Sequence, residues 1–257
     1  MCIIDTVGDG GRNIPADVRG IQLLLNLNGA QPDVLQPDGR WGARSRLALE
    51  CWRQRQGIDT HRPVTPGDAT LEALRLGLPT QLVEHKLWAL LIEASQRHVT
   101  VYQPLLVEML ARYRIDTPLR VAHFFAQIAH ESGCLRYSEE LASGAAYEGR
   151  RDLGNLHVGD GPRFKGRGLI QLTGRANYRQ YGQACQRDFE RHDDPALLGR
   201  DLALAVDVAG WFWARHALNG LADRDDLLGI TRRINGGLNG LEQRAAYLAR
   251  GKWLLMG

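Results

Sequence analysis

Residues 123–133 read HFFAQIAHESG and place one carboxylate among apolar neighbours near the end of an expected helix. The apolar positions recur at three- and four-residue intervals, as in an amphipathic helix: Val121, Phe124, Phe125 and Ile128. Pro118 suits the first turn of this helix and Gly133 marks its end. Glu131 lies seven residues after Phe124, so it shares the apolar stripe and is partly shielded from water, as general acids often are. Glu131 is therefore the leading candidate for a catalytic acid, and a merely solvated glutamate is the alternative.

The composition is that of a soluble globular protein. The chain has 257 residues, of which 44% are hydrophobic and 24% charged, enough for one large or two modest domains. The formal net charge of +3 is too small to indicate nucleic acid as a partner. The cysteines form no C-x-x-C pair, which argues against a disulfide framework or a zinc knuckle: Cys2, Cys51, Cys134 and Cys185.

Neither a secretory signal nor a membrane span is indicated. The N-terminus lacks a cationic region followed by an apolar run, and no apolar run reaches the roughly 18 residues that cross a bilayer. We expect a monomer without stable membrane insertion, made in the cytoplasm, which another factor must release if its substrate lies outside the cytosol. The last expected helix, residues 241–256, mixes basic and apolar residues, and packing on the core is favoured over membrane disturbance.

The first part of the chain predicts three short helices. The first follows Asp17 as an N-cap, the second covers residues 43–57 and the third residues 69–76, with a turn at residues 36–39. The segment Leu76–Thr80 contains Gly and Pro and reads as a linker, so we place a domain boundary near residue 79.

Three motifs in this part resemble the small three-helix peptidoglycan-binding domains: DVRGIQLLLNLNG, DGRWGARSRLALECWRQRQGI and PVTPGDATLEAL. The resemblance covers about residues 5–77 and departs at Ser45 or Arg46, where Thr is usual, and at Trp52-Arg53, which replaces Phe-Gln. It implies a wall-binding surface formed by Asp38, Gly39, Trp41 and Gly42. The alternative is a generic helical module in which residues 38–39 only form a turn.

Residues 80–257 continue the helical pattern, with apolar faces over residues 82–97 and 103–113. Residues 142–168 are rich in Gly, Asp and Asn, which predicts a long functional loop. The expected fold class is therefore mainly α, with a small three-helix domain at residues 1–79 and a larger helical domain at residues 80–257.

A second carboxylate follows the first at Glu140. On one straight helix Glu131 and Glu140 would point to opposite faces, but a helix that ends at Gly133 lets the chain turn back and present Glu140 across a groove. An ion-pairing or surface role for Glu139 and Glu140 is the alternative.

Residues 164–178, FKGRGLIQLTGRANY, supply neutral polar groups. Gln171, Thr173 and Asn177 suit sugar hydroxyls, acetamides and water, and the glycines permit close approach of the backbone. A phosphate loop is the competing interpretation, but the spacing of G-x-x-x-x-G-K-[ST] is not met and no strand precedes the segment.

Together HFFAQIAHESG, Glu140, GRGLIQLTGRANY and the INGG sequence of residues 234–237 resemble glycoside hydrolase family 19. The resemblance spans roughly residues 118–250 and is strongest to the chitinase-like lysozymes among phage endolysins. It implies a lysozyme-like helical domain with Glu131 as general acid, Glu140 as general base and Thr173 as a hydroxyl that helps to hold the attacking water. It also implies substrate-groove residues: Gln171, Asn177, Tyr178, Asn235 and Arg244. Asn239 stands near an acidic position of the plant chitinases, so a third carboxylate is not implied.

Other chemistries are less well matched, and neither a metal nor a cofactor is expected. His130-Glu131 begins like H-E-x-x-H, but Cys134 takes the place of the second histidine. An amidase or peptidase would need a zinc set or a Cys/His pair that we do not find. Residues 211–213, WFW, are interpreted as core and not as a sugar-stacking platform.

The combined features indicate a modular endolysin that hydrolyses β-1,4 glycosidic bonds of bacterial peptidoglycan by acid/base catalysis, as a muramidase. The resemblance to family 19 implies that the reaction inverts the anomeric configuration. Its N-terminal module would hold it on the insoluble polymer. A chitinase acting on GlcNAc polymers and a non-catalytic wall-binding protein are the alternatives.

Overall fold

The computed structural model describes residues 2–58 and 62–256, which form helices and irregular segments joined by isolated β-bridges. The predicted mainly α fold class is confirmed. The first part of the chain forms α1 (Pro15–Leu27), α2 (Ala43–Gln56) and α3 (Ala69–Leu76). The second part begins with α4 (Glu84–Leu90), α5 (Gln96–Arg112), α6 (Pro118–Glu131), η1 (Ala145–Tyr147), η2 (Arg151–Leu153) and α7 (Asp160–Arg163). It continues with α8 (Arg175–Cys185), α9 (Leu197–Arg200), α10 (Leu202–Arg215), α11 (Leu218–Ala222), α12 (Leu227–Asn235) and α13 (Leu241–Leu255).

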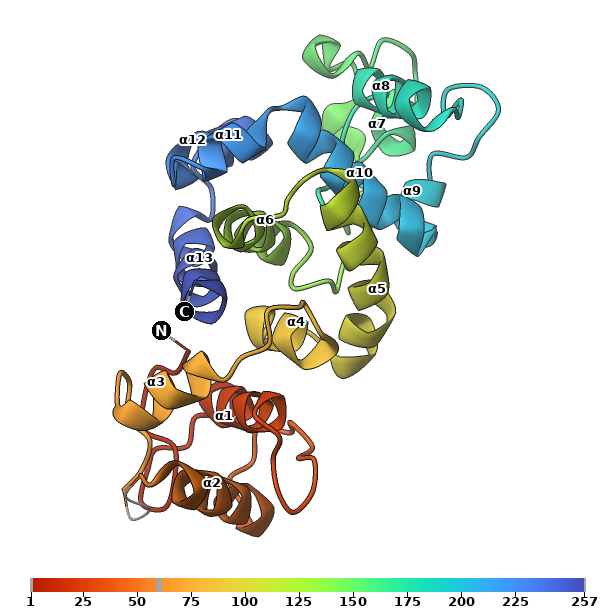
Figure 1. The fold of residues 1–257 in the computed structure, drawn as a ribbon. Coiled ribbons are helices and arrows are strands. Elements are labelled where there is room, and N and C mark those ends of the chain that lie inside the picture. The colour runs from red at the N-terminus through yellow and green to blue at the C-terminus, as the bar shows by residue number, and fades with distance from the viewer. Residues whose placement is uncertain (1, 59–61, 257) are drawn as a thin grey trace.

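Helix α6 lies inside the second part of the molecule, between α13 on one side and α5 and α10 on the other (Figure 1). Thr117 caps its start by accepting a hydrogen bond from the backbone N–H of Arg120, and Pro118 occupies its first turn. The chain leaves the helix at Gly133, whose φ of 54° is a left-handed conformation. On the α13 side, Gly251 permits close packing, because a Cβ there would lie 3.2 Å from the Cα of Ala122.

Three predicted helix bounds are wrong. The expected helix over residues 82–97 is divided, because α4 ends at Leu90 and α5 begins at Gln96. Helix α5 runs without a break through Pro104, because its apolar face from Val99 to Met109 is buried and outweighs one missing backbone hydrogen bond. Helix α1 begins at Pro15, ahead of the predicted cap Asp17, whose side chain instead accepts a hydrogen bond from the N–H of Asp5 at 2.8 Å. The expected loop at residues 142–168 contains short helical turns, namely η1, η2 and α7.

The first three helices pack on the rest of the chain through α1 and α4, and one buried core continues across residue 79. The Arg19 guanidinium donates to the backbone oxygen of Ile92 at 3.1 Å. Arg250 of α13 donates to the oxygens of Ala89 at 2.5 Å and Cys2 at 2.8 Å. The two ends of the chain therefore lie close together (Figure 1).

The aromatic run on α10 contributes to the core: Trp213 is buried and meets Phe124 edge-on with ring centroids 5.4 Å apart. Within the described residues, no helix combines the length and the apolar character needed to cross a bilayer.

Candidate active site

Glu131 is the last residue of α6, and its carboxylate is held from α13. Its Oε1 accepts a hydrogen bond from Arg244 at 2.5 Å, and the Glu131 side chain is 15% exposed. Arg244 also donates to Oε1 of Gln127 at 2.5 Å and to the backbone oxygen of Asn239 at 3.3 Å. The Arg244 side chain is 1% exposed, so it holds the Glu131 carboxylate from the protein interior and is too buried to contact a ligand itself. The prediction of Arg244 as a groove residue is corrected to a buried positioning residue.

Glu140 is held by hydrogen bonds with Gly166 and Tyr147. Its N–H donates to the oxygen of Gly166 at 2.9 Å, and the N–H of Gly166 donates to its Oε2 at 3.1 Å. The second carboxylate oxygen, Oε1, accepts a hydrogen bond from the hydroxyl of Tyr147 at 3.0 Å. Both oxygens of Glu140 are thus oriented, while the residue remains half-buried.

Three polar side chains converge around Gly166. A Cβ built on this glycine would lie 3.1 Å from Oε1 of Gln171, 3.2 Å from Oε2 of Glu140 and 3.3 Å from Oγ1 of Thr173. Gln171 reaches this place from a left-handed backbone conformation, with φ at 57°. The predicted base, the predicted hydroxyl and one predicted groove amide therefore lie within one small region, and the glycine leaves room between them.

Glu139 is an ion-pairing residue, unlike its neighbour Glu140. Its Oε1 lies 3.2 Å from Lys165 and 3.2 Å from Arg167, and its backbone bridges to that of Arg167. Burial alone would raise the pKa of Glu139, but the hydrogen bond from Lys165 and the charge of Arg167 outweigh it and lower the pKa. The alternative of ion pairing thus applies to Glu139.

The other predicted groove residues have different surroundings. Asn177 donates to the backbone oxygen of Thr173 at 2.7 Å and is half-buried at the start of α8. Asn235 ends α12, where it accepts from the N–H of Gly237 at 2.8 Å and donates to the oxygen of Asn239 at 3.1 Å. Tyr178 is fully buried, and its hydroxyl donates to the oxygen of Lys165 at 2.7 Å. The prediction of Tyr178 as a substrate contact is corrected to a support beneath the loop that carries Gly166.

Sequence reasoning missed two residues of the site. Gln127 lies four residues before Glu131 on the same face of α6, and this spacing was a usable signal. Tyr147 lies in η1, within a loop that has no hydrophobic period, so the sequence offered no signal for its contact with Glu140. Among the described residues, no cluster of three or more His, Cys, Asp or Glu side chains is arranged to hold a metal ion.

The predicted wall-binding residues surround the turn between α1 and α2. Gln22, buried in α1, donates to Asp38 at 3.0 Å and accepts from the N–H of Gly39 at 2.9 Å. Gly39 has a φ of 76°, and a Cβ there would lie 2.6 Å from the backbone oxygen of Pro15, so this glycine is required by the fold. Trp41 donates through its indole N–H to Asp9 at 2.8 Å and lines a surface pocket of about 120 Å³. Gly42 caps the start of α2 in an extended conformation and is exposed.

Sequence comparison finds similarity to a known family in the second part of the chain. A family model described as chitinase class I, of glycoside hydrolase family 19, matches residues 116–225. A Haemophilus influenzae protein described as a glycosyl hydrolase family 19 domain-containing protein is 39% identical over 105 residues, which are 41% of this chain and 49% of that protein. An acidic endochitinase of Dioscorea japonica is 32% identical over 124 residues, 48% of each chain. The chain thus spans about half the length of the curated relatives it matches.

Solved structures share the fold. Chitinase C from Streptomyces griseus superposes with a TM-score of 0.57 at 20% identity, over 68% of this chain and 92% of that one. A family 19, class IV chitinase from Zea mays gives a TM-score of 0.54 at 20% identity, over 68% and 92%. The matched segment contains four of the predicted site residues. Glu131 ends α6, and Glu140, Gln171 and Thr173 surround Gly166. Residues 116–225 therefore match glycoside hydrolase family 19, and the chain shares the helical fold of the solved chitinases.

Proposed function

We propose that the chain is a cell-wall glycosidase that hydrolyses β-1,4 bonds between N-acetylated amino sugars of bacterial peptidoglycan. The observation that carries this proposal is the convergence of Glu140, Gln171 and Thr173 around Gly166, with a second partly buried carboxylate at the end of α6. Two carboxyl groups on separate elements are what glycoside hydrolysis requires.

In the proposed reaction, Glu131 donates a proton to the glycosidic oxygen as the bond from that oxygen to the anomeric carbon breaks. Glu140 takes a proton from a water molecule that attacks the anomeric carbon from the opposite face, which inverts its configuration. The Thr173 hydroxyl already donates to the backbone oxygen of Gln171 at 2.9 Å, so its lone pairs are free to accept a hydrogen bond from that water. Tyr147 and the N–H of Gly166 keep the Glu140 carboxylate aimed at the water.

The N-terminal module favours peptidoglycan as the polymer. Its motifs resemble those of wall-binding domains, and the pocket beside Trp41 presents an aromatic ring together with charges of both signs from Asp9, Arg46 and Glu50. A module that holds the enzyme on an insoluble polymer raises the local substrate concentration without adding catalytic groups. We place the enzyme at the wall as a monomeric endolysin, and its partner is the peptidoglycan itself.

Chitin is the second candidate substrate, because several of the relatives are named as endochitinases, including those of Dioscorea japonica and Zea mays. The proposed acid/base chemistry is the same for both polymers. Only the sugars that the groove accepts differ.

The catalytic assignment is tested by Glu131→Gln and Glu140→Gln. Each change keeps the size of the side chain but removes its ability to donate or accept the proton, so each should lower the rate roughly 10²–10⁴-fold. Glu139→Gln is the matched control on the neighbouring carboxylate and should lose much less. Release of reducing ends from purified peptidoglycan measures the rate, and circular dichroism checks the fold. Near-normal activity of both Glu131→Gln and Glu140→Gln would remove these residues from the chemistry.

The bond and the polymer are identified from the products. Peptidoglycan and chitin are digested in parallel, reduced with borohydride and analysed by mass spectrometry. Reduced muramic acid ends are expected from a muramidase, whereas reduced glucosamine ends would mean that the other bond is cut. Cleavage of chitin alone would favour the second candidate, and new amino groups without new reducing ends would contradict glycoside hydrolysis.

A further inference from the structure

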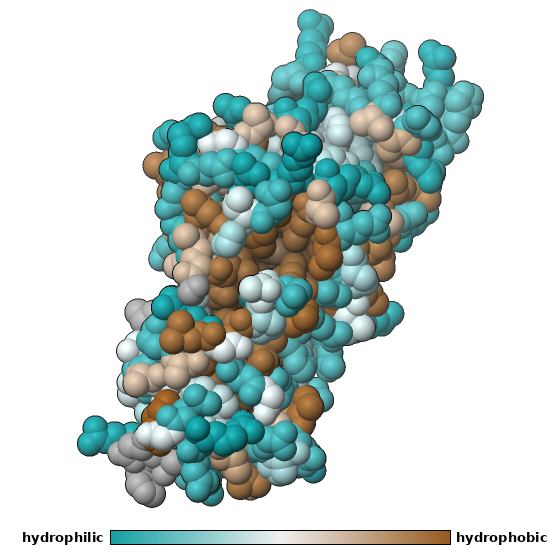
Figure 2. All heavy atoms as spheres, viewed as in Figure 1, coloured by the Kyte–Doolittle hydropathy of each residue, from teal (hydrophilic) through white to brown (hydrophobic). Residues whose placement is uncertain are grey.

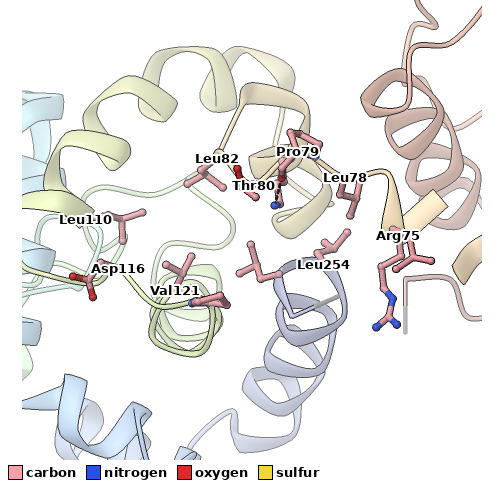
Figure 3. A pocket seen from close by; sticks show the side chains of 13 residues that line it. Arg75, Leu78, Pro79, Thr80, Leu82, Leu110, Asp116, Val121 and Leu254 are labelled. Carbon is pink, nitrogen blue, oxygen red and sulfur yellow. Dashed lines mark hydrogen bonds between the residues drawn. The ribbon is translucent and has the colours of Figure 1, made fainter. Parts of the chain in front are cut away.

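A cavity of about 270 Å³ lies where the N-terminal module meets the rest of the chain. Figure 2 shows apolar side chains gathered in a hollow between the two parts on this face of the molecule. In Figure 3 the lining side chains come from the end of α3, the 77–83 segment, the region between α5 and α6, and the end of α13. Neither Glu131 nor Glu140 lines this cavity, so it is separate from the candidate active site.

The wall of the cavity is mainly aliphatic. Its apolar members come from distant parts of the sequence: Leu76, Leu78, Pro79, Leu82, Leu110, Pro118, Val121, Leu254 and Leu255. Leu76 is 74% exposed, so part of this apolar wall faces solvent. An exposed apolar hollow bordered by polar groups is typical of a site for an apolar ligand.

One buried cation lines the cavity without a counter-charge. Lys86 of α4 is 4% exposed, and its ammonium group donates to the backbone oxygen of Pro79 at 2.5 Å. Within the part of the chain that the structure describes, no carboxylate lies within 4.0 Å of this ammonium group. Burial lowers the pKa of Lys86, as expected for a charge removed from water without an ionic partner. An ammonium group has three N–H donors, so two remain for an anion.

The other charged groups of the lining do not supply this counter-charge. Asp116 pairs with Arg120 at 3.0 Å. Arg75 pairs with Glu72 at 2.8 Å, while its buried Nε has no hydrogen-bond partner. The cavity thus combines an aliphatic wall, a buried cation with unused donors and a second cation nearby.

We propose that this cavity binds a medium-chain fatty acid, with the carboxylate paired to Lys86 and the alkyl chain lying along the aliphatic wall. Charge complementarity selects an anionic head, and the volume suits one chain and not the two chains of a phospholipid. Because the lining comes from both sides of residue 79, a bound fatty acid would stabilise the contact between the module and the rest of the chain by mass action.

The test uses the full chain and laurate at concentrations below micelle formation, with isothermal titration calorimetry and thermal unfolding as readouts. One laurate per chain should bind and raise the melting temperature. Lys86→Met should weaken laurate binding roughly 10- to 100-fold, because a charge-assisted hydrogen bond is lost. Arg97→Met is the matched control, since it removes one positive charge from an exposed position outside the cavity.

Comparisons on the unaltered protein keep the test independent of how Lys86→Met folds. Dodecanol, which has the same chain without the charge, should bind more weakly than laurate, and dodecylamine should bind least. Leu78→Trp, which fills the cavity from the 77–83 segment, should block laurate. Equal binding of laurate and dodecanol, laurate binding untouched by both variants, or no binding at all would overturn the proposal. A dimer in sedimentation that laurate does not disturb would do the same, since a second copy would then cover the hollow.

Discussion

Glu139 and Glu140 are neighbours in the chain, yet their carboxylates have opposite surroundings. Glu139 faces the cations Lys165 and Arg167, whereas Glu140 accepts hydrogen bonds from Tyr147 and the N–H of Gly166. A doublet of glutamates in sequence therefore separates into one ion-paired carboxylate and one that accepts hydrogen bonds from neutral groups, as the proposed general base would.

A second residue-scale feature is the buried His123 of α6. Its Nε2 lies 2.7 Å from Asp225, its Nδ1 has no hydrogen-bond partner, and Lys252 binds the same aspartate. Burial lowers the pKa of His123 and outweighs the opposing effect of Asp225, with smaller contributions from Lys252 and Asp226. The neutral ring then carries its proton on Nε2, facing the carboxylate.

This pKa shift predicts a pH-dependent stability. The folded-state pKa of His123 lies below the unfolded value of about 6.5, so its contribution to folding is complete above that value and is lost as pH falls through the folded pKa. We expect the free energy of unfolding in urea to decrease from pH 7.5 to pH 5, and His123→Gln to flatten this decrease. His192→Gln, at a side chain that is 80% exposed, should leave the slope unchanged. An equal slope in His123→Gln would assign the pH dependence to other groups.

At the scale of elements, the site depends on two features: the end of α6 and the two β-bridges that link residues 139, 167 and 172. The helix was predictable, because its apolar period, Pro118 and Gly133 are all local signals. The partner of Glu131 was not placed correctly, since Arg244 lies 113 residues away and nothing in its spacing on α13 shows that it points into α6. The motif resemblance indicated which residues belong to the region of the site. It could not show which of them are exposed enough to contact substrate and which are buried supports, such as Tyr178.

Because three polar side chains surround Gly166, we predict that Gly166→Ala lowers catalytic activity more than it lowers stability. The new methyl group would meet polar atoms of Gln171, Glu140 and Thr173 at 3.1–3.3 Å, so these side chains must move apart. Each neighbour must give by a few tenths of an ångström, and because a misplacement of about 1 Å costs on the order of 10²-fold in rate, we expect a loss of up to that size. Gly220→Ala is the control, because its Cβ would meet nothing closer than 3.8 Å. Unchanged activity of Gly166→Ala would show that the convergence around this glycine is not part of the chemistry.

At the scale of the whole molecule, the predicted boundary near residue 79 falls in the irregular segment between α3 and α4, but the two sides are not loosely joined. Helix α1 packs on α4, and Arg250 ties the last helix to the oxygen of Cys2. Composition and turn residues located the segment, while the docking could not be read from sequence because it depends on contacts between its distant ends.

A chain that begins at residue 80 tests the division of labour. We expect it to cut soluble wall fragments at nearly the full rate but to sediment less with intact sacculi, because the module adds local concentration and not chemistry. Its melting temperature should fall, since α4 loses the cover of α1 and Arg250 loses a partner. Full-length Arg250→Met is the control that loosens the docking and keeps the module. Equal sedimentation of the shortened and full-length chains would contradict the wall-binding assignment.

If the N-terminal module binds the wall as proposed, the docked ends of the chain would also limit where the enzyme can work. A module on a long flexible linker samples many distances from its anchor, whereas one held by α1, α4 and Arg250 keeps a single separation from Glu131 and Glu140. Each wall-bound molecule would then cut only bonds at one fixed distance from the point where its module is attached. It would have to dissociate from the wall before it could cut a bond elsewhere. Dissociation of the module, and not bond cleavage, would then limit the rate at which an intact sacculus is digested. A module with higher affinity for the wall would therefore make the enzyme slower on whole walls.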